Sequence, residues 1–156
     1  MSSETSNKRL IEGVTRLLRE EVDGWSTNSD YNVANVWPKS PPSDSNDEFP
    51  RAVIDVISGD DTELSVDLDI KLREVILRIV VFGKSNSDVE QLIEDSEDAI
   101  EDHWDESDPN GNPYLGDWSF RELDGFAQMN ETEDSAGDLE YNRYQDFVFE
   151  TVRQTN

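Results

Sequence analysis

The sequence predicts a single α+β domain over residues 1–156, built from an antiparallel or mixed sheet with two helices on one face. Two segments have the 3.6-residue apolar spacing of amphipathic helices, and four others are β-branched or alternating apolar runs typical of strands. These segments follow one another in the order α-β-β-α-β-β. Helices packed on one face of a sheet give an α+β sandwich, and a length of 156 residues favours one domain.

The two helices are expected over residues 7–23 and 87–104. In the first, apolar residues recur at helical spacing and Gly24 fits a C-terminal cap. In the second, Ser87 and Glu90 have the S-x-x-E form of a capping box. The surface of the second helix outside its apolar stripe is almost entirely acidic.

Four strands are expected, over residues 52–58, 70–82, 115–123 and 139–152. The 70–82 segment is apolar on most of both faces, which favours a central strand, and a long buried helix is the competing interpretation. Gly59, Asp60 and Asp61 indicate a turn. Residues 31–37 are expected to be extended, residues 1–6 flexible, and segments 38–50 and 124–138 are predicted to be surface loops.

Charge excludes two classes of partner. The chain has 37 acidic residues against 13 basic ones, a net charge of −24 and an isoelectric point of about 4.1. So few dispersed cations cannot form the positive surface that binds DNA phosphates or anionic membranes. No signal peptide is expected at the N-terminus, and the apolar stretch Val75–Phe82 is too short to cross a bilayer.

The composition resembles that of proteins from halophilic archaea and their viruses. Lysine is scarce, with 4 residues against 9 arginines, and Leu, Ile, Val and Phe together make up only about 24% of the chain. At about 1 M salt the Debye length is about 3 Å, so the repulsion among the carboxylates is largely screened. The alternative is an ordinary acidic protein from a low-salt cell.

The sequence offers little for catalysis. It has no cysteine and a single histidine, His103, which is expected to be solvated, and it lacks the common nucleophile, zinc and phosphate-binding motifs. Carboxylate pairs are so frequent that they indicate no particular site. We therefore expect no enzymatic activity and no cofactor.

One segment has a weak resemblance to a calcium-binding loop. Glu106, Asp108, Asn110 and Asp117 occupy ligand positions at EF-hand spacing. Pro113 and the strand pattern that follows depart from that motif, and a solvated turn is the simpler interpretation.

Several large apolar residues are candidates for contacts between subunits. They flank loops or lie on the second face of the 70–82 strand, and aromatic residues are enriched at interfaces. The alternative is local packing. The candidates are Trp37, Phe49, Ile76, Val80 and Phe126.

Three segments, together with the order of elements, resemble the tail terminator (tail-completion) proteins of long-tailed phages. They are FPRAVIDVI at 49–57, ILRIVVFGKSNSDVEQL at 76–92 and EYNRYQDFVF at 140–149. The likeness is one of pattern and covers about residues 8–153, because that family lacks sharp motifs. Combined with the composition, it points to a tailed virus of halophilic archaea.

The resemblance implies a structural virion protein of the tail and neck, assembled in the host cytoplasm. Such proteins form a six-membered ring that caps the tail tube, joins it to the head-side connector and leaves a channel through which DNA passes without specific binding. The implied partners are other copies of the chain, the tail tube protein and the connector, with no membrane. Two alternatives stay open: another neck or head-completion subunit, and an acidic DNA mimic.

Overall fold

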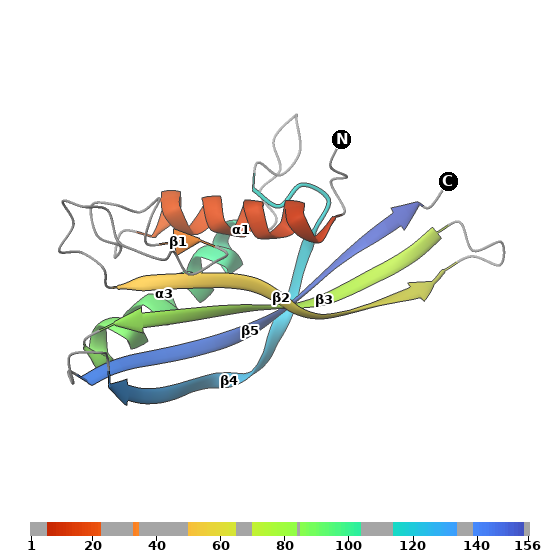
Figure 1. Ribbon diagram of the computed structural model, residues 1–156. Helices are drawn as coiled ribbons and strands as arrows, with labels where there is room; N and C mark the ends of the chain where they lie inside the picture. The colour runs from red at the N-terminus through yellow and green to blue at the C-terminus, as the bar shows by residue number, and fades with distance from the viewer. Residues whose placement is uncertain are drawn as a thin grey trace.

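The computed structural model describes residues 6–22, 33–34, 50–64, 70–83, 85–103, 114–133 and 139–154. The elements, shown in Figure 1, are α1 (Asn7–Glu21), β1 (Val33–Ala34), β2 (Arg51–Glu63), β3 (Ile70–Gly83), α3 (Asn86–His103), β4 (Ser119–Glu133) and β5 (Leu139–Gln154). The strands form one sheet in the order β1-β2-β3-β5-β4. Short β1 pairs parallel to β2, and all other neighbours are antiparallel. The predicted α+β class and element order are confirmed.

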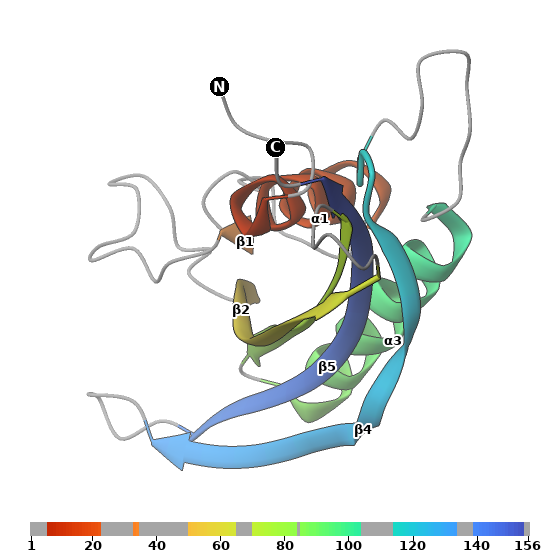
Figure 2. The same cartoon turned by 90° about the vertical axis from the view of Figure 1, so that its right-hand side faces the viewer.

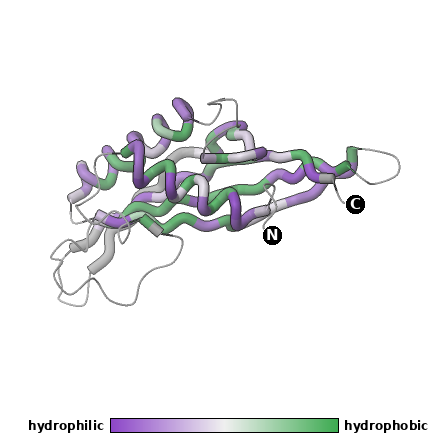
Figure 3. The backbone as a smooth tube through the Cα atoms, turned by 90° about the horizontal axis from the view of Figure 1, so that it is seen from above, coloured by the Kyte–Doolittle hydropathy of each residue, from purple (hydrophilic) through white to green (hydrophobic). Residues whose placement is uncertain are grey.

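Both helices pack on one face of the twisted sheet, as Figures 1 and 2 show. Alternate residues of β3, Val75 to Val81, are buried beneath them. Phe147 and Phe149 of β5 lie opposite Leu77 and Val75 on the same face. Along the helices, hydrophobic and hydrophilic positions alternate (Figure 3), so each helix turns one apolar stripe to the sheet.

Strand β2 is longer than predicted, and the expected turn at Gly59, Asp60 and Asp61 is wrong. The register with β3 shifts between Val56 and Ser58, and pairing then continues to Glu63. A bulge of this kind absorbs one extra residue and lets the ladder resume. The polar residues after the bulge can therefore remain in β2, because the hydrogen bonds that pair the two strands are made by backbone groups.

Strand β4 also includes residues that were predicted to form a loop. The loop expected over 124–138 is strand as far as Glu133, and β4 begins at Ser119 rather than at residue 115. Its register with β5 shifts between Asp124 and Gln128, where Gly125 has a φ of 77°. That backbone conformation suits glycine, which allows the strand to bend and continue.

The helix ends differ slightly from the sequence prediction. The predicted capping box at Ser87 is wrong: α3 begins one residue earlier, and the Asp88 backbone N–H donates to the Ser85 hydroxyl oxygen at 3.5 Å. At α1, the Ser6 hydroxyl oxygen accepts from the Arg9 N–H at 3.1 Å, and the helix ends at Glu21 rather than at residue 23. Serine oxygens thus satisfy N–H groups in the first turn of both helices.

Residues 114–118 connect α1 to the sheet. Arg9 donates to the Tyr114 carbonyl oxygen at 2.6 Å, and the Trp118 indole N–H donates to the Ser6 carbonyl oxygen at 3.1 Å. From the sheet side, the Thr151 hydroxyl donates to the Asp117 carbonyl oxygen at 2.8 Å. Gly13 allows this approach, since a Cβ there would lie only 2.0 Å from the Tyr114 oxygen.

Part of the sheet extends beyond the helices. Figure 1 shows the β2–β3 hairpin and the end of β5 projecting to the right of α1. We call this part the arm and define it as residues 57–63, 70–74 and 150–153. No helix among the described residues is long and apolar enough to cross a membrane.

Candidate interaction surfaces

The sheet face opposite the helices, here called the outer sheet face, carries two of the predicted interface residues. Ile76 pairs with Val148 and Val80 pairs with Tyr144 on this face. Ile76 and Val80 are half-buried. Strand alternation places them there, because their neighbours Val75, Leu77 and Ile79 point into the core.

The outer sheet face is predominantly acidic. Among the described residues, the register places two basic residues on this face, Arg78 and the buried Arg51. Arg121 also reaches this face, where it forms an ion pair with Glu74. The strand register brings Glu74 opposite both Asp60 and Glu150, and Asp124 opposite Asp146. Like charges directly opposite each other disfavour the fold. The acidic residues that the register places on this face are Asp55, Asp60, Glu74, Glu122, Asp124, Asp146 and Glu150.

Arg78 and Asp146 form the most ordered polar contact on the outer sheet face. The guanidinium donates through Nε at 2.8 Å and through Nη2 at 3.0 Å to the two oxygens of Asp146. It also lies over the Tyr144 ring, with its carbon 3.9 Å from the ring centroid. The Asp146 carboxylate raises the pKa of Arg78. The planar guanidinium can bond both carboxylate oxygens and stack on the tyrosine ring at the same time, which the ammonium group of lysine cannot do.

We expect Arg78→Ala to lower the free energy of unfolding by about 1–2 kcal/mol. Loss of the arginine leaves Asp146, whose side chain is 12% exposed, without this partner, and also removes the stacking on Tyr144. Arg78→Lys keeps the charge and should recover only part of the loss. Urea unfolding of the three chains measures this, and equal stability of all three would contradict it.

The other predicted site residues are not assembled by the described structure. Trp37, Phe49, Glu106, Asp108 and Asn110 lie outside the described residues. Phe126 belongs to β4, but its side chain is also outside what is described. Asp117 is exposed and contributes its backbone oxygen to Thr151. Among the described residues, no group of three or more possible ligand residues is placed to hold a metal ion.

Helix α3 presents a continuous acidic surface, here called the acidic face of α3. Burial and the neighbouring charges of Glu101, Asp98 and Glu94 raise the pKa of Glu97. Repulsion within the helix is thus strong enough to act on one of its own members. The acidic residues of this face are Asp88, Glu90, Glu94, Asp95, Glu97, Asp98, Glu101 and Asp102.

The structure also forms a polar cluster that sequence reasoning missed. His103 was expected to be solvated, but its side chain is only 23% exposed and its Nε2 lies 3.2 Å from Glu21 Oε2. The Tyr114 hydroxyl donates to Glu21 Oε1 at 2.6 Å, and burial with this bond raises the pKa of Tyr114. The cluster ties the end of α1 to the end of α3.

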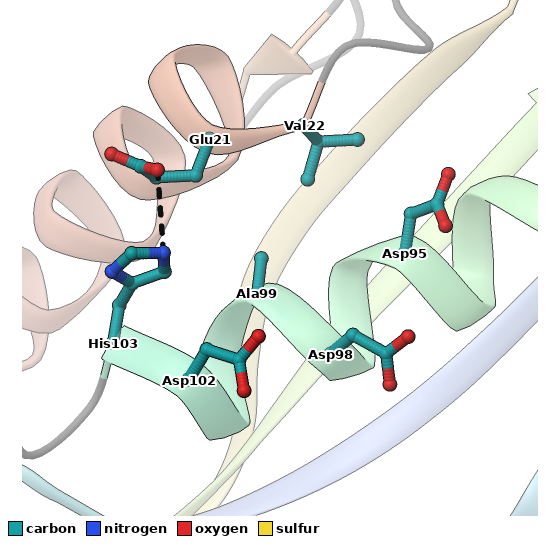
Figure 4. Close-up of a pocket in the computed structure, with 7 residues that line it drawn as sticks. All are labelled: Glu21, Val22, Asp95, Asp98, Ala99, Asp102 and His103. Atoms are coloured by element: carbon teal, nitrogen blue, oxygen red, sulfur yellow. Dashed lines mark ion pairs between the residues drawn. The ribbon is translucent and has the colours of Figure 1, made fainter.

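A shallow pocket of about 300 Å³ opens beside this cluster, between α1 and α3 (Figure 4). The described residues that line it include no serine, threonine or cysteine that His103 could activate as a nucleophile. An imidazole and several carboxylates can move protons. The lining residues are Glu21, Val22, Asp95, Asp98, Ala99, Asp102 and His103.

Comparisons with known proteins identify no family. Searches against protein families and against curated proteins find no match. Among solved structures, a chain from a particle described as "Virion of native gene transfer agent (GTA) particle" is similar to this one, with a TM-score of 0.46 and 12% sequence identity over 94% of this chain and 95% of that chain.

Proposed function

We propose that this chain is a non-enzymatic virion protein that forms a ring at the neck of a tailed virus. In this role it acts as a tail terminator, capping the tail tube, contacting the head-side connector and leaving a channel for DNA. The motivation from the sequence is the resemblance at 49–57, 76–92 and 140–149. The supporting structural observation is the outer sheet face, a broad, predominantly acidic surface on the side of the sheet away from α1 and α3.

The proposed mechanism is electrostatic. In the ring, the part of the outer sheet face outside the arm lines the channel, and its carboxylates repel the DNA backbone at short range. A wall that cannot grip phosphates lets the duplex slide, whereas each lysine or arginine contact would hold it. Even the prominent cation Arg78 is held by Asp146 in a bidentate ion pair, and so it is not free to bind a phosphate.

The acidic face of α3 favours a second candidate, a DNA mimic. Its carboxylates lie on one rigid helix of 18 residues, as a mimic of a phosphate backbone requires. A mimic would act as a monomer bound to a basic nucleic-acid-binding protein. A DNA mimic does not need to form a ring, and the outer sheet face has no function in this role.

Mass measurement at about 1 M salt, where the Debye length is about 3 Å, separates these candidates. We expect a ring of six subunits, which at 17.8 kDa each is about 107 kDa. Light scattering should show this species grow with protein concentration or on addition of tail tubes. A chain that stays monomeric under both conditions, and binds a basic partner tightly, would overturn the proposed ring and favour the mimic.

A further inference from the structure

The arm is the one part of the described structure that exposes large apolar side chains. Ile57 is 46% exposed, Leu64 54%, Ile70 39% and Val152 56%. Leu64 directly follows the arm strand of β2, and its N–H donates to the Ile70 carbonyl oxygen at 2.8 Å. Leu64, Ile70 and Val152 lie on the side of the outer sheet face. Apolar residues gathered on a projection, in a chain this polar, indicate a surface that is covered in the assembled protein.

The other side of the arm carries a cluster of cations. Arg73 donates to both oxygens of Asp61 at 2.8 and 3.1 Å, and Arg153 lies 3.6 Å from the same carboxylate. Arg73, Arg153 and Lys71 together lower the pKa of Asp61. On this side the three cations meet two carboxylates, because the register places Glu63 opposite Lys71 in addition to Asp61 beside Arg73. One net positive charge remains, in a chain of net charge −24.

The matching surface on this chain is the acidic face of α3. There eight carboxylates lie along one helix of 18 residues, so its surface charge is opposite in sign to that of the three cations of the arm. In Figures 1 and 2, the arm and α3 lie at different places on the molecule. Two different complementary patches on one subunit make a head-to-tail contact, and such contacts form a ring where the rotation between subunits closes and an open filament where it does not.

We infer that the arm of one subunit inserts against a second copy of this chain, with Lys71, Arg73 and Arg153 facing the acidic face of α3. Insertion, rather than docking on one side, also removes Leu64, Ile70 and Val152 from water. High salt screens the attraction between the cations of the arm and the acidic face of α3, but it strengthens the burial of apolar side chains. The charged side of the arm therefore contributes most to the contact at low salt, and the apolar side contributes most at high salt. This contact rests on the proposed ring and specifies which surfaces close it.

Charge exchange tests the contact on the full chain. Lys71→Glu with Arg153→Glu should raise the concentration for half-assembly at least about tenfold, a change of about 1.4 kcal/mol. Glu94→Lys with Asp98→Lys should do the same, and the chain carrying all four substitutions should recover assembly. Arg73 is kept so that its pair with Asp61 still holds the arm. Light scattering gives the assembled mass, and urea unfolding shows that each variant is folded.

Two further variants test the apolar side of the arm and the effect of net charge. Leu64→Ser with Val152→Ser should also weaken assembly while leaving unfolding nearly unchanged, because both side chains are more than half exposed. Lys8→Glu with Arg16→Glu makes the same charge change on α1, where these cations pair with Glu12 and Glu20 rather than with residues of the arm, and should assemble normally. If the wild type forms rings and the arm and α3 variants do too, or if the four substitutions together fail to restore assembly, the arm contact is wrong and the ring stands. A wild type that never assembles overturns both.

Discussion

Raising the salt concentration from about 0.1 M to about 1 M should increase the free energy of unfolding by at least about 3 kcal/mol. Over that range the Debye length falls from about 10 Å to about 3 Å, which removes most repulsion among carboxylates that do not touch. The net charge is −24, and the register places acids opposite one another on the outer sheet face. A gain of that size is a large share of the roughly 5–15 kcal/mol of a folded domain. Urea unfolding at both salt concentrations measures it.

Charge-neutral variants distinguish screening from the general strengthening of apolar burial by salt. Glu94→Gln with Glu101→Gln removes two charges that raise the pKa of Glu97. We expect this variant to be more stable at low salt and less dependent on salt. The control, Lys8→Gln with Arg16→Gln on α1, should increase the salt dependence. An unchanged salt dependence in both variants would contradict a repulsive origin.

Burial of Glu97, together with the same repulsion, sets the sign of the pH dependence at low salt. The folded pKa of Glu97 lies above its ordinary value of 4.5, so ionised Glu97 destabilises the fold, and lowering the pH through its folded pKa adds stability. The pKa of Asp61 lies below 3.8, so its contribution is present above its unfolded pKa and is lost only as the pH falls through the lower folded value. Mild acid should therefore partly replace salt.

The sequence predicts those elements whose apolar pattern decides the structure. The alternation in β3 and the stripe of α1 are long and regular, and their burial follows the pattern residue by residue. The second halves of β2 and β4 escaped prediction for the opposite reason. Gly59 to Asp61 have no apolar side chains to bury, and they are strand because their backbone groups pair with β3. The strand conformation of such segments is determined by pairing with a central neighbouring strand rather than by the β-propensity of their own residues.

The candidate surfaces likewise include features that the sequence predicts and features that it does not. Ile76 and Val80 could be placed on the second face of their strand from alternation alone. The pairing of Arg78 with Asp146 could not, because it depends on the register between residues 68 apart in the chain. The arm could not be predicted either, because the expected turn at Gly59 ends the second strand of the chain before residues 60–63, which pair with β3 in the structure.

Adding cations to the outer sheet face should convert a ring that releases DNA into one that retains it. We choose Glu122→Lys with Asp124→Lys, because both side chains are exposed and Asp124 lies opposite the like charge of Asp146. In a ring of six, every subunit would present two new cations to the channel. Each phosphate contact makes the logarithm of the DNA affinity fall with the logarithm of salt with a slope of about −0.9.

Fluorescence anisotropy of a labelled duplex with assembled rings, over a salt series, measures this change. Wild-type rings should show no binding, and the lysine variant should bind with a slope of several units. Glu12→Lys with Glu20→Lys on α1 makes the same change in net charge. It breaks two exposed ion pairs of little worth and the hydrogen bond between Glu20 and Tyr114. If that control retains DNA as strongly, net charge rather than the outer sheet face decides retention. If neither variant binds, the outer sheet face does not line the channel, because a wall carrying those lysines would hold the phosphates that pass it.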